Sequence, residues 1–286
     1  MKLLRHGAAG AERPGLLAAD GTMRDLTGHL PHGHADLDGA MLSPASLAAI
    51  AAIDPATLPI VPADTRLGPC VASINQFVAI GLNYSDHAAE AGMAVPTEPI
   101  MFMKANGSIC GPNDDVIQPP HSIKLDWEVE LGIVIGSDCA YVSEADALAH
   151  VAGYCVVNDI SERNFQLERG GTWSKGKGNA TFGPIGPWLV TADEVGDPQT
   201  LDLWLDLNGE KAQRGNTRTM VFGVAQLVSY VSHYMTLAPG DVITTGTPPG
   251  VGMGMKPPRW LHPGDVMTLG IDRLGQQRQR VVAWSR

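Results

Sequence analysis

The sequence predicts an α+β protein in which short strands outnumber helices. Glycine and proline are abundant, with 33 and 21 among 286 residues, and they separate short apolar segments along most of the chain. Apolar residues make up 44% and charged residues 17% of the composition, which is typical of a globular protein and excludes general disorder. A chain of this length can bury a large core, so we expect one large domain and one smaller domain.

Residues 1–69 are predicted to form the small domain. A strand-turn-strand pattern surrounds residues 15–21, and the alanine-rich residues 46–53 predict a short helix. Residues 54–68 are interpreted as a linker, because four prolines stand in or beside them. The larger domain is then predicted to span residues 70–286.

The larger domain contains a series of strand and helix signals. Ser143 and Asp146 form a capping-box pattern, which predicts a helix that ends at Gly153, just before a strand at residues 154–159. Four leucines alternate with polar residues up to Asn208 and Gly209, which predicts a hairpin. The remaining signals predict the longest helix at residues 219–235, a strand at 242–245 and a final hairpin at 264–284.

The overall charge and the cysteines limit the class of protein. A net charge of −10 is unfavourable for binding nucleic acid or an anionic membrane, because both need a basic surface. The four cysteines form no C-x-x-C pair, so we expect reduced thiols rather than a zinc site or a disulfide framework. The sequence shows no signal-peptide core and no apolar run long enough to span a bilayer. We therefore expect a cytoplasmic protein.

Residues 126–135 alternate in a way that predicts a strand with Glu128 and Glu130 on one face. Such neighbours lie roughly 7 Å apart, so both carboxylates can converge on one cation. Asp159 ends the second apolar run and offers a third carboxylate. Three carboxylates suit Mg²⁺, with Mn²⁺ as the alternative, and leave positions for substrate and water. The competing interpretation is a solvated strand face without a metal.

Residues 81–92 contain a second candidate site. If a helix capped by Ser85 opens here, His87 and Glu90 lie one turn apart on the same face, close enough for the carboxylate to orient the imidazole. A histidine held in this way can act as a general base toward water. The alternative is an ordinary solvated first turn of a helix, because H-x-x-E is a common pattern.

Three further segments carry groups that could meet an anion. Arg163 and Gln166 would share a helical face with Asp159, where Arg163 could hold a carboxylate or form only a local ion pair. Lys177 lies in the glycine-rich residues 170–184, which do not match a nucleotide P-loop. The lysine could neutralise an enolate or a carboxylate, or the segment could be a flexible surface loop. Thr247 follows a strand and offers a hydroxyl and a backbone N–H, unless the turn is purely structural.

Together and in this order, these segments resemble the fumarylacetoacetate hydrolase family. The resemblance covers nearly all of residues 71–286. It rests on N-Y-x-x-H-x-x-E at residues 83–90, W-E-V-E-L-G at 127–132, N-D-x-x-x-R-x-x-Q at 158–166, G-K-G at 176–178 and T-G-T-P-x-G-V-G at 245–252. It implies a mixed β-roll that assembles as a homodimer or homotetramer, and it favours the functional interpretation of each segment.

The resemblance also implies a role for each candidate residue. The expected Mg²⁺ ligands are Glu128, Glu130 and Asp159. The expected water-activating dyad, on a mobile lid, is His87 and Glu90, and the expected stabiliser of developing negative charge is Lys177. The expected substrate-pocket residues are Arg163, Gln166 and Thr247. The chain departs from related sequences at residues 178–180, where Gly-Asn-Ala stands in place of the Ser and Asp that often follow the lysine.

Residues 2–5, 14–17 and 171–177 look like a branch often labelled ureidoglycolate lyase, whose members also act on 2,4-diketo-3-deoxy sugar acids. This likeness implies a small anionic substrate such as L-2,4-diketo-3-deoxyrhamnonate or -fuconate, hydrolysed between C3 and C4 to pyruvate and a short acid such as lactate. Decarboxylation of oxaloacetate and a lyase reaction on ureidoglycolate are rivals, because they also develop charge beside a metal-bound carboxylate. The dyad favours hydrolysis, since only hydrolysis needs a base for water.

Overall fold

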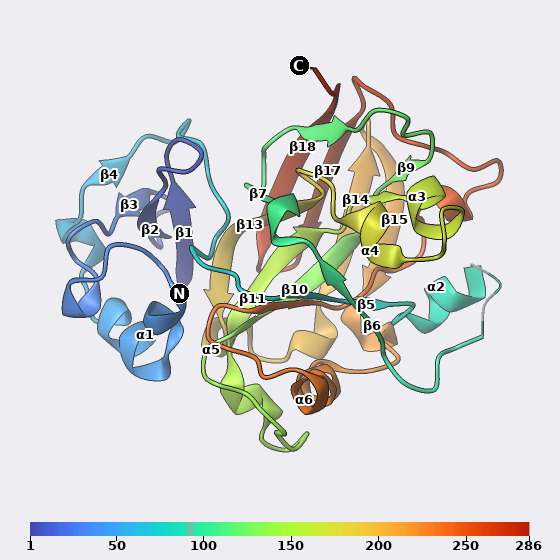
Figure 1. The fold of residues 1–286 in the computed structure, drawn as a ribbon. Coiled ribbons are helices and arrows are strands. Elements are labelled where there is room, and N and C mark those ends of the chain that lie inside the picture. The colour runs from blue at the N-terminus through green and yellow to red at the C-terminus, as the bar shows by residue number, and fades with distance from the viewer. Residues whose placement is uncertain (91, 93, 286) are drawn as a thin grey trace.

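The computed structural model of the chain describes residues 1–90, 92 and 94–285. Strands dominate these residues and form sheets of eleven, five and two strands, while the helices are few and short. Figure 1 shows the N-terminal strands at one side of a larger body that contains the other strands. The predicted α+β fold class is confirmed.

The eleven-stranded sheet carries most of the site. Its order is β4-β3-β2-β1-β13-β11-β10-β16-β5-β6, with β7 pairing with β13. The strands are β1 (Lys2–His6), β2 (Arg13–Leu17), β3 (Met23–Asp25), β4 (Ile60–Val61), β5 (Phe77–Gly81), β6 (Ile100–Lys104), β7 (Ile109–Cys110), β10 (Val129–Ile135), β11 (Val151–Asn158), β13 (Gly183–Thr191) and β16 (Val242–Thr244).

The five-stranded sheet has the order β15-β14-β17-β18-β8. Its strands are β8 (Val116–Gln118), β14 (Asp202–Leu207), β15 (Glu210–Asn216), β17 (Val266–Ile271) and β18 (Gly275–Ala283), and the two-stranded sheet pairs β9 (Leu125–Asp126) with β12 (Ser161–Glu162). Both predicted hairpins are confirmed. Asn208 and Gly209 both have positive φ angles, as a tight turn between β14 and β15 requires.

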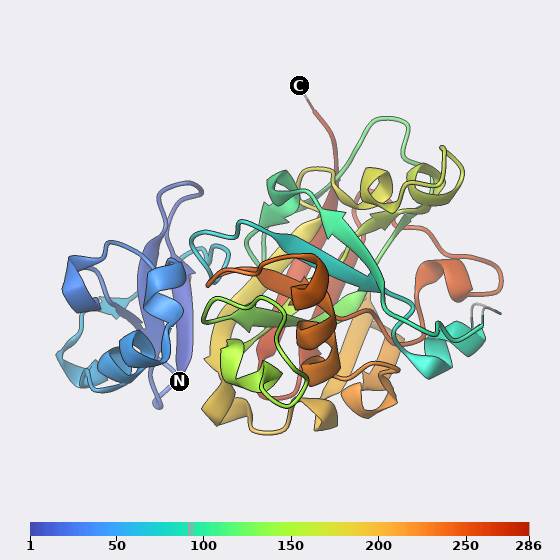
Figure 2. The same ribbon diagram turned by 60° about the horizontal axis from the view of Figure 1, so that its bottom comes forward.

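The helices cover the edges and faces of the sheets (Figure 2). They are α1 (Pro44–Ala51), α2 (Ser85–Glu90), α3 (Arg163–Leu167), α4 (Trp173–Lys177), α5 (Ala192–Val195) and α6 (Val224–Tyr234). Short 3₁₀ segments lie at Pro31–Gly33, Gly39–Leu42, Pro55–Thr57, Asn106–Ser108, Ala147–His150, Pro198–Thr200, Thr217–Thr219 and Gly252–Gly254. The longest helix in the described residues is α6, as predicted, but it begins five residues later than expected.

The helix predicted to follow Ser143 is wrong in its length and its end. Ser143 does cap, since its Oγ accepts a hydrogen bond from the Asp146 backbone N–H at 3.3 Å. Only one 3₁₀ segment follows before the chain enters β11 at Val151. Gly153 lies inside β11, paired with Thr191, where a Cβ atom would overlap the Val190 carbonyl. The glycine therefore permits close strand packing and does not end a helix.

The interpretation of residues 54–68 as a linker is also wrong in part. They contain the 3₁₀ segment Pro55–Thr57 and strand β4, which pairs with β3. Strand β1 joins the N-terminal strands to β13 through Lys2 opposite Val190 and Leu3 opposite Leu189. Leu3 shares one hydrophobic cluster with residues of β10, β11 and β13. The division at residues 69 and 70 remains a prediction.

Strand β10 lies between two hydrophobic clusters. Leu131, Ile133 and Ile135 pack into the larger one, whereas Val134 packs into the cluster that includes the N-terminal strands. All of β10 is buried, which explains why its sequence is apolar on both faces. The polar exception is Glu130 near its beginning. A carboxylate in such surroundings needs partners, which points to a functional role.

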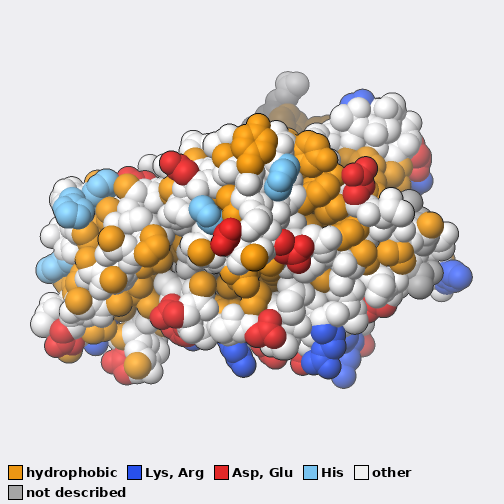
Figure 3. All heavy atoms as spheres, turned by 90° about the horizontal axis from the view of Figure 1, so that it is seen from below, with side chains coloured by type: hydrophobic (Ala, Val, Ile, Leu, Met, Phe, Trp, Pro, Cys, Tyr) orange, Lys and Arg blue, Asp and Glu red, His pale blue; other side chains and the backbone are white. Residues whose placement is uncertain are grey.

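The surface and the thiols agree with the composition. All four cysteines are buried and free. Acidic side chains are spread across the face shown in Figure 3, while Lys and Arg side chains gather in a few places. No helix among the described residues is both long and apolar enough to cross a membrane.

Candidate active site

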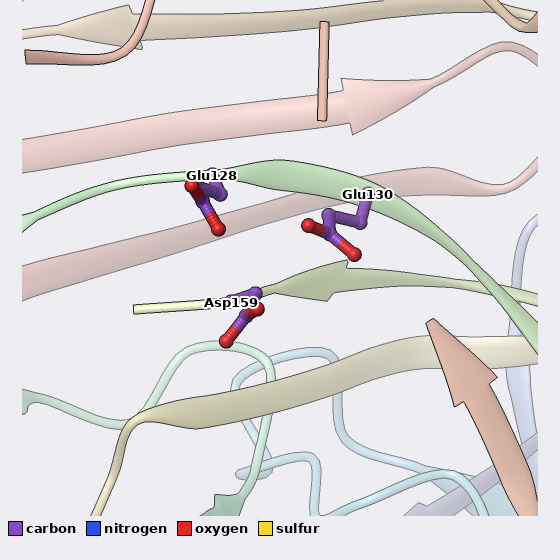
Figure 4. A group of neighbouring side chains, drawn as sticks. All are labelled: Glu128, Glu130 and Asp159. Carbon is purple, nitrogen blue, oxygen red and sulfur yellow. The ribbon is translucent and has the colours of Figure 1, made fainter. Parts of the chain in front are cut away.

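Three buried carboxylates meet where β10 begins and β11 ends (Figure 4). Glu128, Glu130 and Asp159 each offer an oxygen within 4.8 Å of the others, and none is more than 6% exposed. The antiparallel pairing of β10 with β11 brings them together, because the Asp159 backbone N–H donates to the Glu128 carbonyl at 2.9 Å. The interpretation as a solvated strand face is therefore wrong.

Arg163 lies against the triad, although it does not pair with Asp159. Its Nε donates to Asp126 Oδ2 at 2.9 Å and its Nη2 donates to Glu128 Oε1 at 2.6 Å. Its Nη1 donates to Gln166 Oε1 at 3.1 Å. The alternative of a local Asp159–Arg163 ion pair is wrong, because α3 begins only at Arg163 and Asp159 lies before strand β12.

Lys177 joins two of the three carboxylates. Its Nζ donates to Glu128 Oε2 and to Asp159 Oδ2, each at 2.6 Å, and the side chain is 3% exposed. The surface loop proposed as an alternative is wrong for Lys177, which is buried at the end of helix α4, although residues 170–172 are exposed and lie outside any helix or strand. Gly176 lets that helix pack against α3, since a Cβ atom there would lie too close to Gln166. Gly178, part of the departure at residues 178–180, closes the helix where a Cβ atom would crowd Ser174.

Sequence reasoning missed Lys104, which is 1% exposed at the end of β6. Its Nζ donates to Asp159 Oδ1 at 2.5 Å and to the Lys177 carbonyl at 2.8 Å. The two oxygens of Asp159 are thus held by two different lysines. The sequence does contain one signal for it, a lone lysine at the end of the apolar run Ile100–Lys104. A lysine in a buried strand is almost never without a charged partner, so this position indicates a buried ion pair.

Asp126 was also missed. It is fully buried and, besides Arg163, accepts hydrogen bonds from the backbone N–H groups of Gly252 at 2.7 Å and Met253 at 3.1 Å. It therefore ties the turn after Thr247 to the arginine that holds Glu128. A carboxylate immediately before Trp127 gives no signal of these contacts, because Arg163 is 37 residues away along the chain and Gly252 and Met253 are 126 and 127 residues away.

The electrostatics of the triad are unequal. Burial raises the pKa of Glu130, and repulsion from Asp159 and Glu128 raises it further. Burial also acts to raise the pKa of Glu128, but Arg163 and Lys177 outweigh it and lower the pKa overall. Glu130 is held by neutral donors, the Thr244 hydroxyl and the Gly246 backbone N–H, which both reach Oε2. It is the carboxylate whose charge the protein leaves least compensated.

A divalent cation fits this donor set. Four buried carboxylates, counting Asp126, face three buried cations, so the cluster carries surplus negative charge when all are ionised. The three triad carboxylates offer hard oxygen ligands of the kind Mg²⁺ and Mn²⁺ prefer. A bound dication would neutralise the surplus and stabilise Glu130 in its ionised form.

The dyad has the expected geometry. His87 Nδ1 lies 3.0 Å from Glu90 Oε2, and the imidazole is 7% exposed. Glu90 also accepts from the Gly250 backbone N–H at 3.0 Å, which ties helix α2 to the turn after β16. The solvated first turn proposed as an alternative is wrong for His87. Because the carboxylate accepts the Nδ1 proton, Nε2 is left as the basic nitrogen.

The predicted residues converge on one cavity of about 100 Å³. Its lining comprises Ile80, Gly81, Leu82, His87, Glu128, Glu130, Arg163, Gln166, Leu167, Trp173, Lys177, Gly246, Thr247 and Met253. Thr247 Oγ1 already donates to the Val129 carbonyl and accepts from Gln213 Nε2, each at 2.8 Å. Glu90 and Asp159 do not line the cavity but contact residues that do. The structure therefore brings all nine predicted residues together.

Known proteins are similar to this chain in sequence and in fold. Residues 76–282 match the fumarylacetoacetate (FAA) hydrolase C-terminal family. A protein of Burkholderia ambifaria (strain MC40-6) is 64% identical over 280 residues, which cover 98% of each chain. Its name describes it as a hydrolase.

Two solved structures extend the comparison. Fumarylacetoacetate hydrolase from psychrophilic Exiguobacterium antarcticum is 33% identical with a TM-score of 0.86, covering 99% of this chain and 100% of that one. Maleylpyruvate hydrolase from Sphingobium sp. SYK-6, in complex with manganese(II) and pyruvate, is 31% identical with a TM-score of 0.82, covering 100% of both chains. The chain belongs to the fumarylacetoacetate hydrolase family. It is an enzyme with that family's fold.

Replacing Lys104 tests whether its contacts matter for the site. We expect Lys104→Met to weaken the affinity for Mg²⁺ or Mn²⁺ by ~10–100-fold, because Asp159 loses a partner that orients it. Calorimetric titration of the metal-free protein would measure this. Lys175→Met is the matched control, since Lys175 is an exposed lysine on the nearby helix α4. Affinity equal to the wild type in Lys104→Met would show that Lys104 has no part in orienting the carboxylate.

Proposed function

We propose that the protein is a metal-dependent hydrolase that cleaves the C3–C4 bond of a 2,4-diketo acid. The products are pyruvate and a short acid. The single observation that carries the proposal is that the histidine of a histidine–glutamate dyad lines the same cavity as two carboxylates of a buried triad. The triad suits a metal that binds a keto acid, and the dyad suits a base for water.

The residues that would hold the metal are Glu128, Glu130 and Asp159. When bound, the metal supplies positive charge for the carboxylate and the adjacent keto oxygen of the substrate. The complex of a related maleylpyruvate hydrolase with manganese(II) and pyruvate supports this arrangement. Mg²⁺ is the proposed physiological ion, with Mn²⁺ as the alternative.

The reaction begins with a proton transfer from water. His87 Nε2 takes this proton while Glu90 holds Nδ1, and the oxygen attacks C4 of the substrate. The C3–C4 bond then breaks, and its electron pair forms the enolate of pyruvate. His87 returns the proton to C3, so one water is consumed and two acids are formed.

Lys177 accounts for the stabilisation of the enolate. Its ammonium group lies 2.6 Å from oxygens of two triad carboxylates, so it stays at the floor of the cavity as a fixed positive charge. Burial acts to lower the pKa of Lys177, but Asp159 and Glu128 raise it overall, which keeps the group protonated. A preorganised charge of this kind stabilises an oxyanion more strongly than water does.

The proposed physiological substrate is a 2,4-diketo-3-deoxy sugar acid such as L-2,4-diketo-3-deoxyrhamnonate or -fuconate, which would give pyruvate and lactate. Acylpyruvates, diketo sugar acids, oxaloacetate and ureidoglycolate should be compared at saturating Mg²⁺ and without metal, with pyruvate release as the readout. We expect Mg²⁺-dependent pyruvate release from the diketo acids. Pyruvate release from oxaloacetate alone would replace the proposal with a decarboxylase.

Two variants distinguish hydrolysis from decarboxylation. We expect His87→Ala to damage diketo-acid hydrolysis far more than any decarboxylation of oxaloacetate, because only hydrolysis needs a base for water. Lys177→Met should damage both reactions, because both form an enolate. Pyruvate and carbon dioxide should be followed separately. A parallel loss of both reactions in His87→Ala, with oxaloacetate as the better substrate, would favour the lyase.

A further inference from the structure

The floor and the mouth of the cavity have opposite chemistry. The charged lining residues Glu128, Glu130, Arg163 and Lys177 are each 6% exposed or less. Leu167 is 47% exposed, and Leu82, Trp173 and Met253 are partly exposed, so these four apolar side chains form the mouth. A substrate whose carboxylate reaches the floor must place its other end against this apolar mouth.

The cations of the site are already engaged. Arg163 is bound by Asp126, Glu128 and Gln166, and Lys177 is bound by two triad carboxylates. They are the permanently charged cations among the described lining residues. Counted with the buried Asp126, Asp159 and Lys104 behind the lining, the cluster carries one surplus negative charge. A divalent ion at the triad would turn it into one positive charge, which a single substrate carboxylate matches. A second carboxylate at the mouth would meet no free cation among the described lining residues.

Packing and backbone conformation fix two of the side chains at the mouth, Trp173 and Leu82. Trp173 packs over Gly81, where a Cβ atom would overlap the indole, and its ring meets Phe102 edge-on with centroids 5.3 Å apart. Leu82 has a φ angle of 53°, in the left-handed region that a bulky residue rarely adopts. Such a conformation persists only where the surrounding structure imposes it, and it is often found at ligand sites.

We propose that Leu82, Leu167, Trp173 and Met253 select diketo acids whose acyl group is uncharged and ends in a small apolar group such as a methyl. The same mouth rejects diketo acids whose acyl group carries a second carboxylate. The cavity volume of about 100 Å³ suits a small substrate. This inference rests on the proposed function, since it concerns the part of the same substrate that lies beyond C4.

A matched pair of substrates tests the selection. 2,4-Dioxoheptanoate and 2,4-dioxoheptanedioate have chains of equal length and differ only in a terminal methyl or carboxylate. We expect kcat/KM for the monoacid to exceed that for the diacid by at least ~100-fold, because an unpaired charge is costly to remove from water. Pyruvate release at saturating Mg²⁺ is the readout for both acids.

Substitution of Met253 tests whether the mouth causes the selection. Met253→Lys places a cation there and should shift the ratio of the two kcat/KM values toward the diacid by ~10-fold or more. Met253→Gln, of similar size but uncharged, should not improve the diacid. The ratio is insensitive to a general loss of activity, so a partly damaged variant still gives a result.

The results of these assays distinguish a failure of the proposed selectivity from a failure of the proposed hydrolase activity. If the wild type released pyruvate from the diacid as efficiently as from the monoacid, the selection would be overturned while the hydrolase activity stood. Unequal turnover with the ratio unchanged in Met253→Lys would overturn the role of the mouth. If neither acid, nor any other diketo acid, released pyruvate with Mg²⁺, the proposed function would be overturned and the inference with it.

Discussion

Glu130→Gln is expected to reduce Mg²⁺-dependent turnover to below roughly 1% of the wild type, because a metal in such a site supplies several kcal/mol of charge stabilisation. Glutamine has nearly the same shape and can still accept from Thr244 and Gly246, so the fold should persist. The variant also removes a buried carboxyl group, whose pKa is raised by burial and by its acidic neighbours Asp159 and Glu128. Steady-state assays in metal-buffered solution would measure the loss.

The control for Glu130→Gln is Glu144→Gln, which changes an exposed glutamate by the same chemistry. Both variants should show thermal unfolding close to that of the wild type in the absence of metal. Added Mg²⁺ should stabilise the wild type and Glu144→Gln but not Glu130→Gln, because a ligand raises stability only if it binds the native state. Near-normal activity of Glu130→Gln in metal-buffered solution would contradict the assignment of the metal site.

His87→Ala is expected to lower kcat by roughly 10²–10⁴-fold, which is the usual contribution of a general base. KM should change much less, because the imidazole acts on water and not on the part of the substrate that binds the floor. His233→Ala is a suitable control, since that histidine is exposed on α6. Initial rates over a range of diketo-acid concentrations separate the two parameters.

Glu90→Gln refines the test of the dyad. It removes the charge that orients the imidazole but leaves His87 in place, so its effect on kcat should be smaller than that of His87→Ala. Glu90 also accepts from the Gly250 backbone N–H, which a glutamine oxygen can still do. If His87→Ala raised KM strongly and left kcat unchanged, His87 would be a binding residue and not a base.

The parts of the site that the sequence predicted are those set by local geometry. The strand predicted over residues 126–135 is divided into β9 and β10, and Glu128 lies just before β10, but Glu128 and Glu130 do converge as expected. Helical spacing places His87 beside Glu90. Asp159 was found because it ends an apolar run. The order of these segments along the chain then identified the family. Each of these signals needs only a few neighbouring residues.

The parts that the sequence could not predict depend on distant contacts. The acidic partners of Arg163 are Asp126 and Glu128, 37 and 35 residues earlier, and not the nearby Asp159. Lys104 meets Asp159 across fifty-five residues, and nothing within β6 indicates that contact. The helix expected after Ser143 is cut short because β11 takes up the following residues to pair with β10. In each case sheet pairing overrides or supplements the local pattern.

The most direct test of the account is the source of oxygen in the short acid. In a single turnover with a diketo acid and Mg²⁺ in ¹⁸O-labelled water, hydrolysis at C4 puts one solvent oxygen into the new carboxylate. Substrate recovered from the same reaction controls for exchange at the C4 carbonyl. We expect ¹⁸O in the released acid beyond that exchange, formed together with pyruvate and lost in His87→Ala. Pyruvate formed with no solvent oxygen in the other product would contradict hydrolysis.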